Sequence, residues 1–215
     1  MEKISYFNNV NSQNEDGSKI PGAVLIAVYG GLLIITNYLV QTQVSVYGLL
    51  LTVGLITYPI TFWITDYACE VYGRQRAFQM VMLGLALSVI PSLMVSTIQI
   101  TFGSLLAYTL AHIHEVWAFH FWKSRTEGRY LWLRSLAAQS VSEFIDTLVF
   151  TFVAFFGTLN GQMILSIMTS EYPVKLLYAF VGLGPLYAGV ALARAAGWGL
   201  LAHRRQGTNN AVVTA

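Results

Sequence analysis

Acidic side chains interrupt the apolar stretches of this sequence, and in two stretches the acid follows another ionisable side chain by three residues. Glu143 and Asp146 stand in one stretch, and His112 and Glu115 stand in another. Residues three apart share one face of an α-helix. Such a pair can accept hydrogen bonds from a ligand, neutralise a cation or hold a proton. The spacing therefore predicts a polar binding site carried by two apolar helices.

The composition excludes an ordinary soluble domain. Of the 215 residues, 55% are hydrophobic and only 10% are charged, a balance typical of membrane proteins with several spans. The length suffices for about six spans of roughly 20 residues. We therefore expect an all-α integral membrane protein with six transmembrane helices, the first two joined by a tight turn over residues 41–45. Apolar runs bounded by Pro, Gly and charge place the helices near residues 21–40, 46–65, 77–97, 103–122, 134–156 and 174–196.

The basic residues predict how the helices are oriented. All but one of the 12 Lys and Arg residues fall on one side of the expected membrane, and Lys175 is the exception. Because positively charged connections stay in the cytoplasm, we expect both termini there and an even number of helices. The predicted organisation is a cytoplasmic tail over residues 1–20, a six-helix transmembrane domain over 21–196 and a second cytoplasmic tail over 197–215.

An internal repeat joins the two acid-bearing helices, the fourth and fifth of the predicted set. Residues 104–121 align without a gap with residues 135–152, and Glu115 falls on Asp146. Duplicated helices related by a pseudo-symmetry axis are common in secondary transporters. The repeat therefore favours a paired site near the middle of the bilayer.

A carboxylate at that depth is costly. Glu143 and Asp146 are expected about 14 to 18 Å into their span, where an ionised carboxylate costs roughly 2.5 to 3.5 kcal/mol. These acids should therefore face the bundle interior or a wet cavity, with at least one of them protonated or paired. The alternative for such groups is hydrogen bonding between helices, with no substrate involved.

Other polar residues extend the candidate substrate site. His112, Asn37 and Gln139 are expected as polar neighbours of Glu115, Glu143 and Asp146. Lys175 stands alone on the outer side. It either extends its charged end to the membrane boundary or contacts the substrate at the outer mouth.

A second group of charges is expected near the inner end of the second helix. Asp66 and Glu70 share a helix face, and Arg74 follows four residues later. These three residues are candidates for an inner gate or for proton coupling. The alternative is an ion pair that only stabilises the helix end.

The sequence lacks the motifs of several other functions. Cys69 is the only cysteine, and no His-Glu-x-x-His or Walker motif is present, so we expect no disulfide, no metal site and no ATP hydrolysis by this chain. We predict that the protein uses no cofactor and has no catalytic residues.

Several short motifs follow one another in a recognisable order. They are Asn37-Tyr-Leu-Val, Gly54-x-x-x-x-Pro59-x-x-Phe62-x-x-x-Asp66-x-x-x-Glu70-x-Tyr72-Gly73, Phe102-Gly-Ser104, Leu131-Trp132-Leu-Arg134 and Asp146-Thr147-x-x-Phe150. In these motifs the chain resembles the queuosine precursor transporters, also described as vitamin uptake transporters, a family of small six-helix proteins of the bacterial inner membrane.

The resemblance implies import of queuosine precursors, which are 7-deazaguanine bases such as queuine or its simpler precursors, for salvage of the tRNA modification. For such a substrate we expect alternating access around a midplane acidic site, with Glu143 or Glu115 binding the guanine edge and Asp146 binding a substrate amine. The expected partners are this small molecule and the lipid bilayer, not a nucleic acid; monomer and homodimer stay open. Two other classes remain as alternatives: the substrate-capture subunit of an energised vitamin importer, and an intramembrane enzyme.

Overall fold

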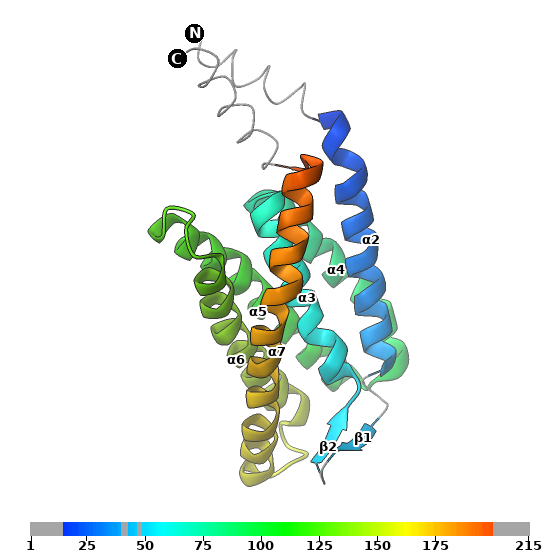
Figure 1. The fold of residues 1–215 in the computed structure, drawn as a ribbon. Coiled ribbons are helices and arrows are strands. Elements are labelled where there is room, and N and C mark those ends of the chain that lie inside the picture. Colours follow the sequence, from blue (N-terminus) through cyan, green and yellow to red (C-terminus); the bar gives the residue numbers. More distant parts are fainter. Residues whose placement is uncertain (1–14, 40–42, 47–48, 200–215) are drawn as a thin grey trace, which may run out of the picture.

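The computed structural model describes residues 15–39, 43–46 and 49–199. These residues form six helices and one short hairpin (Figure 1): α2 (Glu15–Leu39), β1 (Gln43–Val46), β2 (Leu49–Thr52), α3 (Gly54–Val71), α4 (Arg74–Val95), α5 (Ile98–Arg125), α6 (Leu131–Phe155) and α7 (Gly161–Ala196). The predicted all-helical fold with six helices is confirmed. The outermost parts of both predicted tails, residues 1–14 and 200–215, lie outside the described residues.

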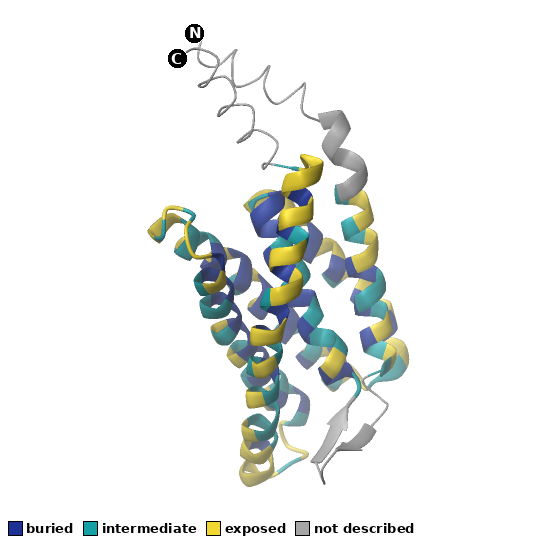
Figure 2. Ribbon diagram, in the orientation of Figure 1, coloured by how far each residue is buried: buried dark blue, intermediate teal, exposed yellow. Residues whose placement is uncertain are grey.

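Four of the described helices are long and apolar enough to cross a membrane: Gly22–Leu39 within α2, and α4, α6 and α7. α3 carries more polar side chains, and its neighbours cover it most. Of the α3 residues only Ile56 is exposed, whereas exposed residues recur along α7 and along α2 from Gly22 on (Figure 2). α5 also carries polar side chains, but its outer face is exposed at residues such as Phe102 and Trp117. The polar face of α3 thus lies in the interior, and apolar faces of the other helices form much of the surface.

Several predicted boundaries are wrong: α2 begins at Glu15, within the predicted tail, and α3 ends at Val71 rather than near residue 65. An antiparallel hairpin, in which Val46 pairs with Leu49, replaces the tight turn expected after the first helix. Because the hairpin extends to Thr52, α3 begins at Gly54 rather than near residue 46. α7 begins at Gly161 rather than near residue 174, and Pro173 lies inside it. With 36 residues, α7 is about 54 Å long, well beyond a hydrocarbon core of about 30 Å.

The two repeated helices, α5 and α6, run antiparallel and pack closely against each other. At one end the Gln99 side chain of α5 donates to the carbonyl oxygens of Val153 and Phe156, at 3.1 and 2.9 Å. The same helix face is buried in both copies of the repeat. The equivalent buried pairs include Gly103/Arg134, Ala107/Ala138, Tyr108/Gln139, Ala111/Ser142, His112/Glu143, Glu115/Asp146 and Val116/Thr147.

The helices alternate between two ends of the bundle. The start of α2, the α3–α4 turn, the α5–α6 turn and the end of α7 lie at one end (Figure 1). That end carries the described basic residues Arg74, Arg76, Lys123, Arg125, Arg129 and Arg194. The charge asymmetry expected from the sequence is therefore present in space. That this end faces the cytoplasm stays a prediction.

The close approach of α5 to α6 makes Gly103 a test of the packing. A Cβ on Gly103 would lie 2.9 Å from the backbone nitrogen of Ala154. Gly103→Ala should therefore force the helices apart and lower the free energy of unfolding by about 1 to 3 kcal/mol. Thermal unfolding of the purified protein in detergent measures the change. Gly31→Ala is the matched control, because nothing lies within 4 Å of its Cβ; equal losses in the two variants would contradict the packing argument.

Candidate functional site

The polar residues of α3 repeat at helical spacing and face the bundle interior. Thr61, Thr65, Asp66 and Glu70 are all buried, with Asp66 completely so. Side chains four residues apart lie on one face of a helix, and side chains of α5 and α6 meet this face of α3: His112 approaches Thr61 and Thr65, Gln139 bonds to Asp66 and Arg134 pairs with Glu70. α3 therefore forms the polar centre of the bundle, and its partners on the other helices define the candidate site.

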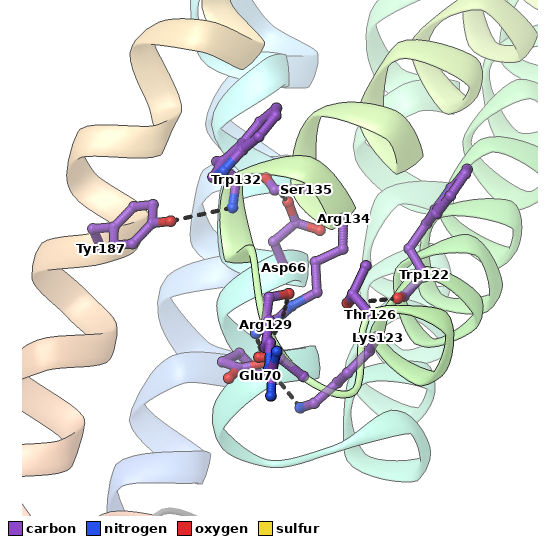
Figure 3. A network of polar contacts seen from close by, with 11 residues as sticks. Asp66, Glu70, Trp122, Lys123, Thr126, Arg129, Trp132, Arg134, Ser135 and Tyr187 are labelled. Atoms are coloured by element: carbon purple, nitrogen blue, oxygen red, sulfur yellow. Dashed lines mark hydrogen bonds and ion pairs between the residues drawn. The ribbon is translucent and has the colours of Figure 1, made fainter.

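One end of this centre holds a group of ion pairs, which we call the Glu70 cluster (Figure 3). Its members are Asp66, Glu70, Lys123, Arg134 and Ser135, which Figure 3 labels, and Gln139. The Glu70 carboxylate lies 2.8 Å from Lys123 Nζ and 2.7 Å from Arg134 Nη2. Asp66 Oδ2 accepts hydrogen bonds from the Ser135 hydroxyl and, at 2.6 Å, from Gln139 Nε2. The cluster ties α3 to α5 and α6.

Arg134 is buried, although its position in the sequence indicated a membrane boundary. It counted as one of the basic residues at a membrane boundary, yet only 1% of its side chain is exposed. Its Nη1 donates to the carbonyl oxygens of Gly128 and Arg129, at 2.8 and 3.1 Å. Arg134 thereby connects Glu70 to the α5–α6 turn.

The ion pair considered as the alternative for Glu70 and Arg74 is not formed. α3 ends at Val71, and Gly73, with φ of 86°, turns the chain into α4. Arg74 is the first residue of α4 and is exposed. Glu70 and Arg74 therefore lie on different helices, and the partners of Glu70 come from α5 and α6 instead.

A second group of charges surrounds Lys175 and is called here the Lys175 cluster: Tyr58, Glu143, Asp146 and Lys175. Lys175 Nζ lies 2.6 Å from Asp146 Oδ2 and 3.5 Å from Glu143 Oε2. The Tyr58 hydroxyl donates to Asp146 Oδ1 at 2.8 Å. Since Lys175 is 5% exposed, the interpretation that it reaches the membrane boundary is wrong. It joins α7 to α6 and α3.

His112 lies among aromatic rings rather than beside Glu115. Its ring stacks on Phe62 at 4.2 Å between centroids and contacts Tyr58 and Tyr108. Its two ring nitrogens each lie 3.4 Å from a threonine hydroxyl of α3. This aromatic group offers flat, apolar surfaces in an otherwise polar centre.

Glu115 differs from the other buried acids because both of its buried carboxyl oxygens lack a hydrogen bond to the described residues, whereas Asp66, Glu70 and Glu143 each have only one such oxygen. Its side chain is fully buried next to Asp66 and Ser142. Neither carboxyl oxygen forms a hydrogen bond with any residue that the structure describes. Leaving a buried acceptor unmatched costs about 1 to 3 kcal/mol, and more for a charged group. Such a carboxyl is suited to take a proton or a ligand that carries two adjacent donors.

The three acids expected to meet in one site fall into two groups, and the antiparallel repeat explains this. Facing residues on α5 and α6 include Gln99 with Phe156, and His114 with Ser142 at 2.8 Å. On this register Asp146 lies at the level of residue 110 of α5, about 7 Å along the axis from Glu115. The repeat therefore places Glu115 beside Asp66 and its counterpart Asp146 beside Lys175.

The remaining predicted residues divide in the same way. Gln139 belongs to the Glu70 cluster through its bond to Asp66. Asn37 is half-buried on α2 and donates to the carbonyl oxygen of Leu33, at 2.9 Å, in its own helix. In the described parts of the chain, no group of three or more His, Cys, Asp and Glu side chains is placed to hold a metal ion.

Sequence reasoning missed Tyr58 and Phe62, although a signal was present. They precede Asp66 by eight and four residues and so share its helix face. A scan for aromatic residues on the acid-bearing face would have found both.

Comparison with known proteins identifies the family. The family model described as "Putative vitamin uptake transporter" matches residues 52–99 and 92–190. A "Probable queuosine precursor transporter" of Bacillus subtilis is 30% identical over 176 residues, which cover 71% of this chain and 77% of that protein. The chain belongs to the vitamin uptake transporter family. The "Queuosine precursor transporter" of Escherichia coli is 28% identical over 186 residues, or 75% of this chain and 82% of that protein. No solved structure matches the chain.

Family membership confirms the resemblance seen in the motifs. The relatives are named as transporters, so this member of the vitamin uptake transporter family is a multi-pass membrane transporter rather than an enzyme. The matched residues include both charged clusters and Glu115 but not Asn37.

The Glu70 cluster predicts a stability effect at Arg134. Arg134→Met leaves Glu70 with Lys123 alone in a buried setting, and breaking a buried ion pair from one side typically costs about 3 to 5 kcal/mol. We expect a clearly lower thermal unfolding midpoint in detergent. Arg129→Met, which removes an exposed charge from the same turn, should change stability by less than about 0.5 kcal/mol. Similar midpoints for the two variants would contradict the role given to Arg134.

Proposed function

We propose that this transporter imports queuosine precursors, 7-deazaguanine bases such as queuine or its simpler precursors, across the bacterial inner membrane for salvage of the tRNA modification. The names of its relatives support this substrate class. The observation that carries the proposal is the buried Glu115 carboxyl, whose two oxygens have no hydrogen-bond donor among the described residues.

The chemistry of the base matches this group. A 7-deazaguanine presents the N1 proton and the 2-amino group side by side, so a carboxylate can accept two parallel hydrogen bonds from it. Its flat face suits stacking on aromatic side chains. Tyr58, Phe62 and Tyr108 lie around His112, one helical turn from Glu115. Between the two guanine-edge candidates we therefore choose Glu115 over Glu143, whose oxygen already faces Lys175.

The other predicted contacts enter this proposal in different ways. Gln139 bonds to Asp66, the carboxyl beside Glu115, and His112 lies one helical turn before Glu115 on α5, so both can adjust to polar groups of the base. Asp146, expected to bind a substrate amine, already pairs with Lys175 and Tyr58, so a substrate amine would have to compete with Lys175 for it. Asn37 enters the site only if α2 moves toward it, because its amide now bonds within its own helix.

We infer that transport proceeds by alternating access, with α5 and α6 moving as a unit against the rest of the bundle. The Glu70 cluster links this unit to α3 near one end of the bundle, and the Lys175 cluster links it to α3 and α7 near the middle of α6, beyond the level of Glu115. Opening one cluster while the other stays closed would expose Glu115 to one side of the membrane. Asp66 and Glu70 are then inner-gate residues, with exposed Arg74 available as a partner when the cluster opens.

Energy coupling through protons fits the contact of Asp66 with Glu115. Two adjacent carboxyls in a dry interior repel each other when both are ionised, so one proton is favoured between them. A base that donates hydrogen bonds to both oxygens of Glu115 competes with that shared proton. Binding of substrate and movement of a proton would thereby be linked.

The first test of the proposal concerns Glu115. Glu115→Gln replaces one acceptor with a donor that faces the donors of the base, so we expect binding to weaken by about 30-fold or more. Uptake of labelled queuine into cells that lack other salvage routes, and thermal stabilisation of the purified protein by queuine, measure the loss. Glu127→Gln is the control, because Glu127 is an exposed acid on the α5–α6 turn. Uptake by Glu115→Gln at the rate of this control would refute the assignment.

The second test concerns coupling. Wild-type uptake of labelled queuine is expected to slow several-fold when an uncoupler collapses the proton gradient. Asp66→Asn cannot share a proton with Glu115, so its residual uptake should not respond to the uncoupler, whereas Glu127→Gln should respond as the wild type does. Wild-type uptake that is indifferent to the uncoupler would exclude proton coupling.

A further inference from the structure

Lys175 places a cation of the protein next to the two acids best suited to bind a cation of the substrate. Its Nζ contacts Asp146 Oδ2 at 2.6 Å and Glu143 Oε2 at 3.5 Å. Queuine and the aminomethyl precursor carry an amine that is protonated near neutral pH, whereas other 7-deazaguanines are uncharged. The cation that pairs with Asp146 and Glu143 therefore influences which bases the transporter accepts.

We propose that Lys175 determines charge specificity: its ammonium takes the place of a substrate amine, so the site favours uncharged 7-deazaguanines over amine-bearing ones. This inference rests on the proposed function, since it concerns the same substrate site.

The contacts around Asp146 leave little capacity for a second cation. Its Oδ1 accepts from the Tyr58 hydroxyl at 2.8 Å and its Oδ2 from Lys175. Both oxygens of Asp146 are thus engaged. Lys175 is held in place from a third side, because its Nζ lies 5.5 Å from the centre of the Tyr58 ring, within the range of a cation–π contact.

A substrate amine has two ways to reach this acid pair, and both weaken binding. It can lie beside Lys175, where two like charges repel each other strongly in a buried setting. Alternatively it can displace Lys175, which leaves a buried ammonium without its partners. A base without the amine avoids both penalties.

Glu171 adds negative charge to the surroundings of Lys175. It lies four residues earlier on α7 and is only partly buried. Its attraction acts on a substrate cation in the wild type and in Lys175 variants alike. The decisive quantity is therefore the change in the ratio of affinities for a charged and an uncharged base, not one affinity alone.

The experiment compares two bases of nearly equal size, 7-aminomethyl-7-deazaguanine and 7-hydroxymethyl-7-deazaguanine. Affinities come from thermal stabilisation of the purified full chain in detergent over a range of ligand concentrations. The wild type should bind the hydroxymethyl base at least about tenfold more tightly. Lys175→Met should move the ratio at least about tenfold toward the aminomethyl base, because both acids then need a cation.

Matched variants separate charge from structural damage. Lys175→Arg keeps the positive charge and should keep the wild-type preference for the hydroxymethyl base. Lys123→Met also removes a lysine paired with an acid, but in the Glu70 cluster, and should leave the ratio unchanged. If Lys175→Met does not fold, the double variant Lys175→Met with Glu143→Gln removes one charge of each sign and should still move the ratio toward the amine.

The outcomes distinguish this inference from the proposed function. Binding of both bases with the same ratio in wild type and in whichever of the two Lys175→Met variants folds would overturn the role of Lys175 alone. Stabilisation by neither base would overturn the proposed function and this inference with it.

Discussion

A carboxylate buried in an apolar bundle is stable only when cations or hydrogen-bond donors face it, because neither lipid nor a dry core solvates the charge. In this protein those partners come from other helices. Glu70 is paired from α5 and α6, and Asp146 from α3 and α7. The charged contacts therefore hold α5, α6 and α7 around α3. The same requirement explains why the acid-bearing face of α3 lies in the interior of the bundle.

Much of the fold could be predicted from the sequence, because apolar runs of membrane length are a strong signal. All six helices were expected, and their order and even number were correct. The hairpin was missed because the apolar run after residue 45 continues into α3, and periodicity does not separate a short strand from the start of a helix. α7 was predicted too short because Pro173 was taken as its beginning, although a membrane helix tolerates proline.

The site could be predicted only in part. Acids in apolar segments stand out by residue type alone, so Glu115, Glu143 and Asp146 were found. Which cation faces which acid depends on the rotation and register of helices far apart in the sequence, and no local pattern encodes it. Arg134 was therefore taken for a boundary residue and Lys175 for a boundary residue or an outer-mouth contact, when each is buried against an acid of a different helix.

The antiparallel repeat turns one duplicated acid into two unlike environments. Glu115 and Asp146 occupy equivalent positions on α5 and α6. Because the two helices are antiparallel, the acids lie at different heights, on opposite sides of the pseudo-symmetry axis that relates the helices. One acid meets a second carboxyl, and the other meets a lysine. A symmetric pair of helices can therefore keep one unpaired acid for a ligand and one paired acid for closure. Alternating access needs this kind of asymmetry, because the contact that closes one end must not depend on the group that holds the substrate.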